Sequence, residues 1–457
     1  MSHSQTQPDS LYRSAADRET QRVAFRNGNV PVAVYGLGKM GLPLAAVYAD
    51  VTGNTVGVDI DPAVVDGVAA GECHVAREPG LSNLVERVVD RGALAATTDG
   101  ERAAADAAVH VLMVPTLLTD EQEPDLSMLT AATEAIAAGL SQGDLVVVES
   151  TIPPGTCTDV LVPILEARSG LTVGEFGVAC CPERTLSGQA LADIRGTHPK
   201  VVGGVDAAST RAATLIYGEI TDNEVLTTTD AATAAAVKVF EGVYRDVNIA
   251  LANELARYAE PLGIDTREAI DVANTQPYCD IHDPGPGVGG HCIPVYPYFL
   301  ARQFDVEAPL LETARTVNDA MPAHTVAQLN AILDHHGTAV SDATVLMLGV
   351  TYKANIAELR NAPSLPMATD LESRGASVLA VDPLVSDWAA IDAVEPVTLA
   401  EAKTRDVDAV ALVTPHDEFR DLDWGAFDAP VLDGRNVLAD SQQDVPVYTV
   451  GGRWPGR

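Results

Sequence analysis

The sequence predicts an α/β protein in which two doubly wound, parallel-sheet domains are joined by a long central helix. From Val30 onward, short apolar runs alternate with helical stretches, a pattern typical of buried parallel strands separated by helices. A glycine-rich turn follows the first of these runs, and a second series of runs begins at Thr344. The long helical stretch between the two series divides the chain into two α/β domains.

The first domain is predicted over residues 30–222, after an N-terminal segment of residues 1–29. That segment is polar and shows no apolar period, so we expect a flexible arm that is either disordered or loosely docked. The strands of the first domain are predicted at Val32–Tyr35, Thr55–Asp59, Val109–Val114, Leu145–Glu149 and Val178–Cys181.

A central helical domain, which would carry the dimer contact and the candidate nucleophile Cys292, is predicted over residues 223–325. Its long helix runs from about Ala231 to Glu260, and Pro261 and Gly263 end it. A helix of this length commonly connects domains or forms a dimer seam. Its apolar face is predicted to contain Val239, Val243, Val247, Ala250, Leu251 and Leu255. The last domain, residues 326–457, has predicted strands at Thr344–Gly349, Ser377–Val381, Ala409–Val413 and Val431–Leu432.

The composition excludes several classes of function. Hydrophobic residues make up 47% of the 457 residues, enough for a sizeable core. Lys and Arg total 29 against 64 Asp and Glu, a formal charge of −35, which repels nucleic acids and anionic membranes. Only five residues are lysines, and an acidic, lysine-poor chain is typical of adaptation to high salt, where screening weakens self-repulsion. An acidic, GC-rich genome is the alternative explanation.

The cysteines and the N-terminus predict a cytoplasmic protein. Six cysteines show no CxxC pair and no zinc spacing, so we expect a reducing compartment and no metal site. The N-terminus lacks a signal-peptide pattern, and no apolar stretch reaches the roughly 18 residues that a membrane-spanning helix needs.

A glycine-rich turn after the first strand predicts a Rossmann-like dinucleotide site. Such a turn lets a pyrophosphate approach backbone N–H groups at a helix N-terminus. Eighteen residues after its last glycine, Asp59 ends the next strand, where a carboxylate accepts both ribose hydroxyls and disfavours a 2′-phosphate. The cofactor is therefore predicted to be NAD rather than NADP. The turn consists of Gly36, Leu37, Gly38, Lys39, Met40 and Gly41.

A cysteine at the end of a second glycine-rich segment is the candidate nucleophile. Cys292 follows residues 284–290, which contain four glycines in seven positions. Exposed backbone amides and the adjacent His291 can lower the pKa of the thiol. A buried structural cysteine is the alternative, but the density of glycines favours a reactive one.

Polar side chains at the ends of other strands complete the candidate site. Thr151 and Glu183 each follow a predicted strand, and ligands of open α/β sheets bind beyond the carboxyl ends of strands. One face of the long helix is expected to contain Lys238, Gly242 and Arg245. The side chains of Lys238 and Arg245 would then point into the same cleft. In the last domain Tyr352, Lys353 and Arg435 follow strands, which suits a second phosphate-bearing ligand such as a nucleotide.

Together these motifs resemble the UDP-glucose/GDP-mannose dehydrogenase family. GLGKMGLP, VPT, ESTIPPGT, CPER, the lysine and RDVNIALANEL of the long helix, PGPGVGGHCIP, LGVTYK…LR and DGR occur in that order. CPER, RDVNIALANEL and VNDAMP are similar to the UDP-N-acetylmannosamine dehydrogenase branch.

The resemblance implies a reaction and a role for each residue. The family oxidises the C6 alcohol of a nucleotide sugar to a carboxylate with two NAD⁺ and one water, without releasing the aldehyde. Cys292 would be the nucleophile, Lys238 would stabilise developing oxyanions, Glu183 would act near the hydrolytic water, and Thr151 would position that water. Homodimers through the long helix are typical of the family.

The resemblance also assigns two groups of binding residues. Those expected to contact NAD are the Gly36–Gly41 turn, Asp59, Thr116, Ser150, Thr151 and Arg360, the last reaching it from the partner subunit. Those expected to hold a UDP-sugar are Glu183, Arg184, Lys238, Arg245, Gly287, Gly289, Gly290, His291, Tyr352, Lys353 and Arg435.

Three positions depart from the family pattern. Gly242 stands where the family has Asn, Tyr296 stands where it has Asp, and Gln276-Pro277-Tyr278 replaces a His-Pro-Arg sequence. The Asn and the Asp normally support the lysine and its water. Three hypotheses therefore stay open: oxidation of UDP-N-acetylmannosamine, oxidation of UDP-glucose or UDP-N-acetylglucosamine, and a catalytically weak protein that binds nucleotide sugars.

Overall fold

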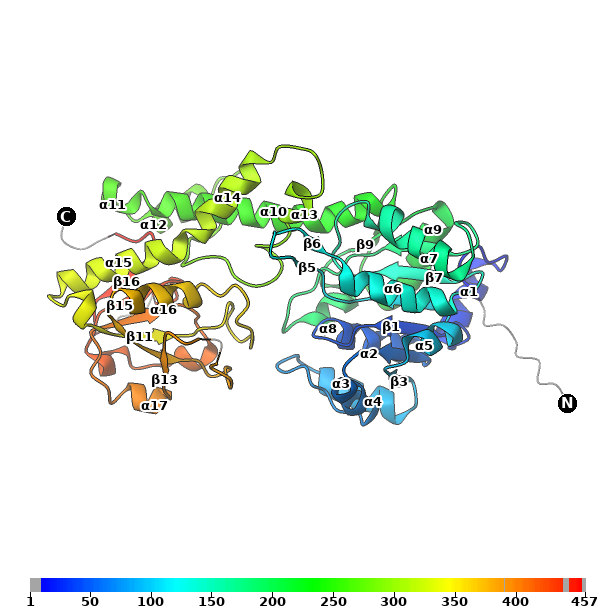
Figure 1. The fold of residues 1–457 in the computed structure, drawn as a ribbon, viewed down its shortest axis with the longest axis horizontal. Coiled ribbons are helices and arrows are strands. Elements are labelled where there is room, and N and C mark those ends of the chain that lie inside the picture. The colour runs from blue at the N-terminus through cyan, green and yellow to red at the C-terminus, as the bar shows by residue number, and fades with distance from the viewer. Residues whose placement is uncertain (1–9, 390, 439–443, 454–457) are drawn as a thin grey trace. The chain divides into compact units, whose positions relative to one another are not determined.

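The computed structural model describes residues 10–389, 391–438 and 444–453. The chain divides into two compact units (Figure 1). Unit 1 consists of the residues up to Phe240 together with Tyr298–Gln303, and unit 2 consists of Glu241–Pro297 and the residues from Phe304 onward. Each unit contains a mainly parallel sheet covered by helices, so the predicted α/β class is confirmed.

Unit 1 is built on an eight-stranded sheet in the order β10-β9-β8-β7-β4-β1-β2-β3. All neighbouring strands are parallel except β8 and β9. The five predicted strands are present, each within two residues of the expected bounds. The strands are β1 (Val32–Tyr35), β2 (Thr55–Val58), β3 (Leu94–Thr97), β4 (Val109–Leu112), β7 (Leu145–Val148), β8 (Gly177–Cys180), β9 (Lys200–Gly204) and β10 (Val225–Thr227).

Both faces of this sheet are buried, as expected for a parallel sheet. In β1, Val32 and Val34 belong to one core cluster, and Ala33 and Tyr35 belong to the other. The first cluster contains side chains of α1 (Arg18–Arg26), α2 (Gly41–Thr52), α3 (Pro62–Ala69), α4 (Leu81–Asp90) and α9 (Ala207–Ile220). The second contains side chains of α5 (Gly100–Asp106), α6 (Ser127–Gly139) and α7 (Val162–Ser169). The remaining elements are the hairpin β5 (Leu117–Leu118) and β6 (Pro124–Asp125), α8 (Ala190–Ala192), and π-helical turns at Cys157–Leu161 and Asp193–Thr197.

The N-terminal segment is docked on unit 1 where the structure describes it. Leu11 and Tyr12 are 2% exposed and Phe25 is fully buried in the core of unit 1. Asp17 caps α1 by accepting the N–H of Thr20. Within residues 10–29 the structure therefore favours the docked alternative over a disordered arm, because a few apolar side chains without a period are enough to dock the segment. Residues 1–9 lie outside the described part of the chain.

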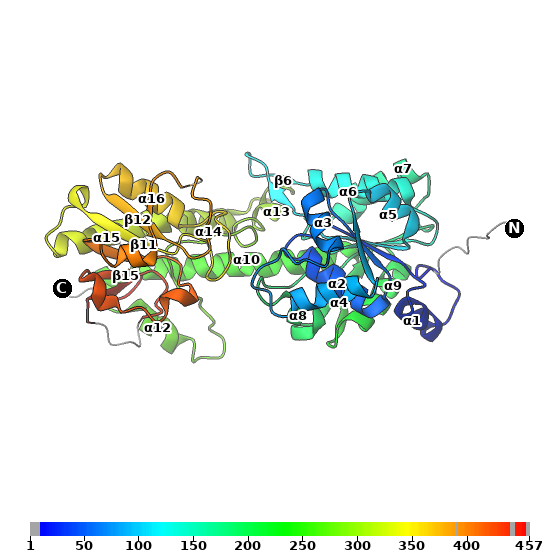
Figure 2. The same cartoon turned by 90° about the horizontal axis from the view of Figure 1, so that it is seen from below.

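The predicted long helix is present as α10 (Ala231–Ala256; Figure 2). A short helix, α11 (Ala259–Leu262), follows it, so the chain leaves the long helix four residues before the expected end. Val239 and Ala250 are buried as predicted, but Leu251 is 49% exposed and does not belong to the buried face. Whether residues 223–325 form a domain of their own stays a prediction.

Unit 2 is built on a six-stranded parallel sheet in the order β13-β12-β11-β14-β15-β16. Alternate residues of β11 belong to two core clusters, one formed with α15 and α16 and the other with α17 and the turns near Trp424. The strands are β11 (Thr344–Leu348), β12 (Ser377–Val381), β13 (Glu395–Pro396), β14 (Ala409–Leu412), β15 (Val431–Asp433) and β16 (Val447–Thr449). The helices are α12 (Thr266–Ala273), α14 (Pro309–Asp319), α15 (Met321–His335), α16 (Ser364–Ser373) and α17 (Leu399–Ala402), with 3-10 turns at Val340–Asp342, Asp417–Phe419 and Trp424–Phe427; α13 (Tyr298–Ala301) belongs to unit 1. No helix in the described ranges is long and apolar enough to cross a membrane.

Candidate active site

The glycine-rich turn of unit 1 has the shape that a pyrophosphate site needs. Gly36 has a φ of +94°, and a Cβ added to Gly41 would lie 1.9 Å from the carbonyl oxygen of Gly36. A side chain at either position would disrupt the turn at the start of α2. A Cβ on Gly38 would have no atom within 4 Å, so the backbone there is open to an approaching phosphate.

Asp59, directly after β2, completes the fit to NAD. One of its carboxylate oxygens accepts the N–H of Leu37 at 2.8 Å, and the other accepts the N–H of Asp61 at 3.0 Å. Because a carboxylate offers about four acceptor positions, Asp59 retains capacity for ribose hydroxyls. These backbone contacts also tie the acid to the glycine-rich turn that would hold the pyrophosphate.

The predicted residues after β4 and β7 are linked at the carboxyl edge of the sheet. The Ser150 hydroxyl accepts the N–H of Val114 at 3.0 Å and donates to its carbonyl at 2.8 Å. The Thr116 hydroxyl donates to the carbonyl of Thr151 at 2.5 Å. Ser150 and Thr151 are 3% and 7% exposed. The two loops are therefore held together at the edge where the cofactor of an open sheet binds.

Glu183 and Lys238 form a sheltered ion pair in unit 1. The Lys238 ammonium lies 3.2 Å from Glu183 Oε1, and the two side chains are 13% and 14% exposed. Glu183 Oε2 accepts the N–H and the hydroxyl of Thr185 at 2.8 and 2.6 Å. Burial alone would raise the pKa of Glu183, but the Lys238 ammonium and the Thr185 donors outweigh it and lower this pKa. An ionised carboxylate beside a lysine can accept a proton or orient a water.

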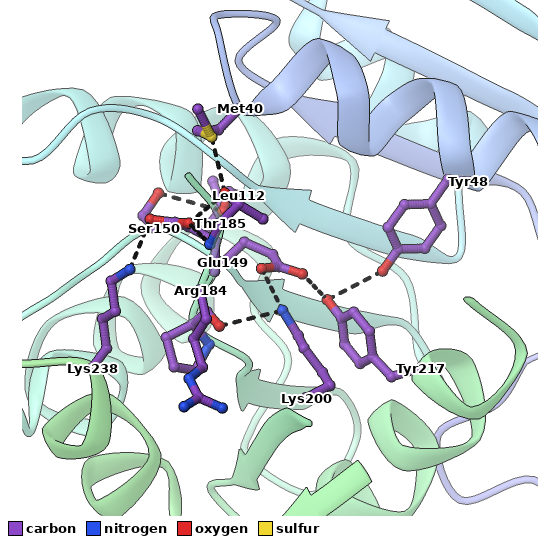
Figure 3. Close-up of polar contacts among 12 residues, drawn as sticks. Met40, Tyr48, Leu112, Glu149, Ser150, Arg184, Thr185, Lys200, Tyr217 and Lys238 are labelled. Carbon is purple, nitrogen blue, oxygen red and sulfur yellow. Dashed lines mark hydrogen bonds and ion pairs between the residues drawn. The ribbon is translucent and has the colours of Figure 1, made fainter. Parts of the chain in front are cut away.

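A buried network next to Glu183 was not predicted (Figure 3). The Lys200 ammonium donates to Glu149 at 2.6 Å and to the carbonyl of Pro182 at 3.3 Å. The Tyr217 hydroxyl also donates to Glu149. Burial raises the pKa of Glu149, although Lys200 and Tyr217 oppose this shift. A lysine at the start of β9 in a lysine-poor chain was the available signal, but its partner depends on the fold.

This network supports the loop that carries Glu183. The Glu183 N–H donates to the carbonyl of Glu149 at 3.0 Å, and the Arg184 guanidinium donates to the carbonyl of Pro199 at 2.8 Å. A cavity of about 30 Å³ is lined by Glu149, Glu183, Thr185, Lys200 and Tyr217, among others. Arg184, predicted to bind substrate, thus has at least one contact that fixes its own loop.

In unit 2, the glycine-rich loop before Cys292 is anchored at many points. Gly287 and Gly290 have φ angles of +145° and +87°, and a Cβ on Gly289 or Gly290 would lie 2.7 Å from Tyr352. Glycines at these positions therefore allow the loop to pack closely on Tyr352. The anchoring contacts are Gly285 N–H to Asn253, Arg267 to Pro284 O, Arg435 to Gly287 O, Asn361 to Gly290 O, and Gly290 N–H to Arg360 O.

Buried polar side chains on α10 and α14 hold this loop. Asn253 accepts the N–H of Gly285 at 2.9 Å and donates to Asn318 at 2.9 Å. Asn318 donates to Asp246 at 2.8 Å, and Arg315 donates to Asp246 at 2.5 Å. The RDVNIALANEL and VNDAMP motifs are thereby given a structural role, which the sequence did not show because the two helices meet only in the fold.

The surroundings of Cys292 favour its thiolate. The His291 imidazole is next to Cys292 in the chain, and its Nδ1 lies 3.4 Å from Glu358 Oε1. The proximity of Cys292 and of the Glu358 carboxylate raises the pKa of His291 to about 10, which favours a cationic ring at neutral pH. Burial and the positive charge of Arg245 lower the pKa of Lys353, and Cys292 opposes that shift. Cationic neighbours stabilise a thiolate.

The loop that carries Tyr352 and Lys353 is fixed by a buried histidine. His416 Nδ1 accepts the N–H of Asn355 at 3.0 Å, so Nε2 carries the hydrogen and reaches Asp382 and Thr351, both at 3.0 Å. This contact holds Lys353 at the carboxyl end of β11, where a ligand of the sheet binds. Arg435 occupies the corresponding place after β15, and burial lowers its pKa to about 10.

Two of the three departures from the family pattern are in contact with each other. Gly242 and Tyr296 are in contact in unit 2, with a 5% exposed Tyr296 packed on the backbone of α10. Tyr278 is 93% exposed. Among the predicted polar residues, Lys238 pairs with Glu183 in unit 1 and Arg245 lies within electrostatic range of Lys353 in unit 2.

Comparison with known proteins assigns the family. Models of the UDP-glucose/GDP-mannose dehydrogenase family match residues 30–221 as the NAD binding domain, 232–320 as the central domain and 346–440 as the UDP binding domain. The chain belongs to this family. It is an NAD-dependent UDP-sugar dehydrogenase, so the predicted class of enzyme and the predicted cofactor are confirmed.

Individual relatives agree on the class and differ in the sugar that their names give. The chain is 34% identical over 415 residues to the UDP-N-acetyl-D-mannosamine dehydrogenase of Pyrococcus horikoshii, covering 90% of this chain and 96% of the relative. It is 37% identical over 410 residues to the NDP-N-acetyl-D-galactosaminuronic acid dehydrogenase of Ralstonia nicotianae, covering 88% and 94%. A solved structure of the P. horikoshii UDP-D-ManNAc dehydrogenase superposes with a TM-score of 0.85 at 33% identity, covering 92% of this chain and 99% of that one.

Proposed function

We propose that this dehydrogenase oxidises the C6 alcohol of UDP-N-acetylmannosamine to a carboxylate through a covalent bond to Cys292. The observation that carries the proposal is the place of Cys292 at the end of the anchored glycine-rich loop, directly after His291, whose pKa is raised. A thiolate in this setting is a nucleophile for an aldehyde carbonyl. NAD, when bound, supplies the hydride acceptor for both oxidations.

The side chains described above divide the remaining chemistry. Lys238 stabilises negative charge on the C6 oxygen of the sugar while the hydroxyl proton passes to a base-relayed water. The Cys292 sulfur then bonds to the C6 carbon of the aldehyde to form a thiohemiacetal, and the second oxidation converts it to a thioester. Water attacks the thioester carbon, the carbon–sulfur bond breaks, and the thiolate is regenerated. Glu183 takes the proton of that water and Thr151 positions it, consistent with the lowered pKa of Glu183.

The nucleotide and the cofactor are proposed to bind to residues that the structure holds in place. Lys353, Arg435 and the loop at Gly287–Gly290 would hold the UDP-sugar, with the contacts within unit 2 pre-organising them. The turn at Gly36–Gly41 and Asp59 would hold NAD, with its pyrophosphate on the open backbone at Gly38.

A homodimer through the long helix is supported by an exposed apolar stripe. Phe240, Tyr244 and Leu251 of α10 are 49–58% exposed and recur at intervals of four and seven residues. This spacing places them on one side of the helix. We propose that a second copy covers the stripe and that Arg360 then reaches the NAD of the partner subunit.

A cytoplasmic location also stays a prediction.

A panel of UDP-sugars tests the substrate. We expect UDP-N-acetylmannosamine to give a higher kcat/KM than UDP-glucose, UDP-N-acetylglucosamine or UDP-N-acetylgalactosamine, measured as NADH formation in molar KCl. Preference for another sugar would keep the reaction and change the substrate. Binding of NAD and UDP-sugars without turnover would instead support a catalytically weak protein that binds nucleotide sugars. The two replacements, Gly242 for Asn and Tyr296 for Asp, favour this alternative.

A further inference from the structure

Two of the departures from the family pattern occupy the same space. A Cβ placed on Gly242 would lie 2.2 Å from Cδ2 of Tyr296 and 3.1 and 3.2 Å from its Cγ and Cβ. Real Cβ atoms essentially never come within 3.0 Å of another atom. The Tyr296 side chain therefore requires a glycine at position 242. Even an alanine there would push the Tyr296 ring away from the backbone of α10.

The position of this contact links it to the nucleophile. The N–H groups of Val295 and Tyr296 both donate to the carbonyl of Cys292 at 3.0 Å, so these residues form one turn that carries the thiol. Tyr296 and Val295 are each 5% exposed. The ring of Tyr296 thus packs the turn that carries Cys292 against the backbone of α10 at Gly242.

We propose that Gly242 and Tyr296 are a single matched pair and that Tyr296 is a positioning residue for Cys292. The pair replaces an Asn and an Asp, two short polar side chains, with one aromatic ring packed on a bare helix backbone. The ring fixes the turn by packing, where the polar pair would need hydrogen bonds and water. The positioning role rests on the proposed function of Cys292, whereas the matching of the two residues does not.

The sign of a stability change tests the matching. In the interior of a helix, Gly→Ala raises stability when nothing obstructs the new methyl group. We expect Gly242→Ala to lower the Tm by at least about 2 °C in the wild-type background because of overpacking. In a Tyr296→Ala background the same change should raise the Tm by about 1–4 °C. The same sign in both backgrounds would overturn the pair.

A second pair of variants tests the match in the opposite direction. Gly242→Asn and Tyr296→Asp should each lower the Tm, the first by a clash and the second by an unfilled space. Combined, they should give a Tm above that of Gly242→Asn alone. A double variant no more stable than this single variant would contradict the proposal.

The reactivity of Cys292 tests the positioning role without requiring turnover. We expect Tyr296→Ala to raise the apparent pKa at which Cys292 is alkylated, because the loosened turn weakens its contact with His291. Tyr296→Phe keeps the ring and should keep the wild-type pH profile. Tyr448→Ala removes a tyrosine of matched burial, 6% exposed in the core of unit 2, and should lower the Tm without changing the Cys292 profile.

Kinetics complete the test if the enzyme turns over. Tyr296→Ala should lower kcat more than it raises the KM for the UDP-sugar, since a mispositioned thiol slows chemistry rather than nucleotide binding. A wild-type alkylation profile in Tyr296→Ala would overturn the positioning role. A wild-type enzyme that alkylates normally but does not turn over would count against the proposed function and leave the matched pair standing.

Discussion

The replacement of His291 by glutamine should make Cys292 much less reactive at neutral pH. The proximity of Cys292 is the largest cause of the raised pKa of His291, and Glu358 is the second. By linkage, whatever stabilises the imidazolium through the thiolate stabilises the thiolate equally. Glutamine keeps a hydrogen-bonding side chain of similar length but carries no positive charge, so the substitution isolates the charge.

The size of the effect follows from the same geometry. The pKa of His291 moves from 6.5 to about 10, but its side chain is 39% exposed, so solvent screening reduces what the pair contributes. A cationic neighbour commonly lowers the pKa of a thiol by about one unit or more, so we expect removal of the charge to lower the thiolate population at neutral pH about 10-fold or more. The thiol pKa in His291→Gln should therefore rise toward the unperturbed value of about 8.5.

Alkylation with iodoacetamide across pH 5–10.5, followed by mass spectrometry of the Cys292 peptide, measures this directly. In the wild type, the pKa of His291 is raised to about 10, so a cationic imidazole should keep Cys292 reactive and its alkylation rate nearly flat across neutral pH. In His291→Gln the rate should climb with pH as for a free thiol. The half-buried Cys73 and Cys279 provide internal controls. Identical profiles in the two proteins would refute the reasoning.

Four other substitutions or conditions give expected outcomes. Lys200→Met should lower the free energy of unfolding, measured in urea, by about 3–5 kcal/mol, because it leaves the buried Glu149 carboxylate uncompensated. Adding Glu149→Gln to this variant should recover part of the loss. A loss without recovery would contradict the explanation that the missing ion pair causes it. Glu183→Gln should lower kcat about 10²–10⁴-fold as expected for a lost general base, while NAD affinity, measured by calorimetry, stays unchanged. Leu251→Asp should shift the mass in light scattering from dimer to monomer, whereas a dimer that persists would exclude the stripe as the interface. The formal charge of −35 should lower the Tm in dilute buffer relative to molar KCl, and equal values would count against adaptation to high salt.

Features carried by local pattern were predictable from the sequence. The strands Val32–Tyr35 and Ser377–Val381 were found with the predicted bounds because continuous apolar runs of this length are typical of buried parallel strands. The glycine-rich turn and Asp59 were also predicted, since their spacing along one βαβ unit determines their contact.

Features that depend on distant partners were not predictable. Gly242 and Tyr296 are fifty-four positions apart. From the sequence, each was therefore interpreted separately as the loss of a polar group, and their contact was not predicted. Glu149 and Lys200 pair across β7 and β9, two strands separated in the sheet by β8. The docking of Leu11, Tyr12 and Phe25 needed no periodic pattern, because isolated apolar side chains suffice where a core surface is available.

The ratio of NADH formed to UDP-sugar consumed tests the central claim most directly. With UDP-N-acetylmannosamine limiting in molar KCl, a Cys292-dependent four-electron oxidation predicts two NADH per sugar and a carboxylate product, and Cys292→Ala should abolish this overall reaction. One NADH per sugar with free aldehyde, or two NADH per sugar from Cys292→Ala, would contradict it.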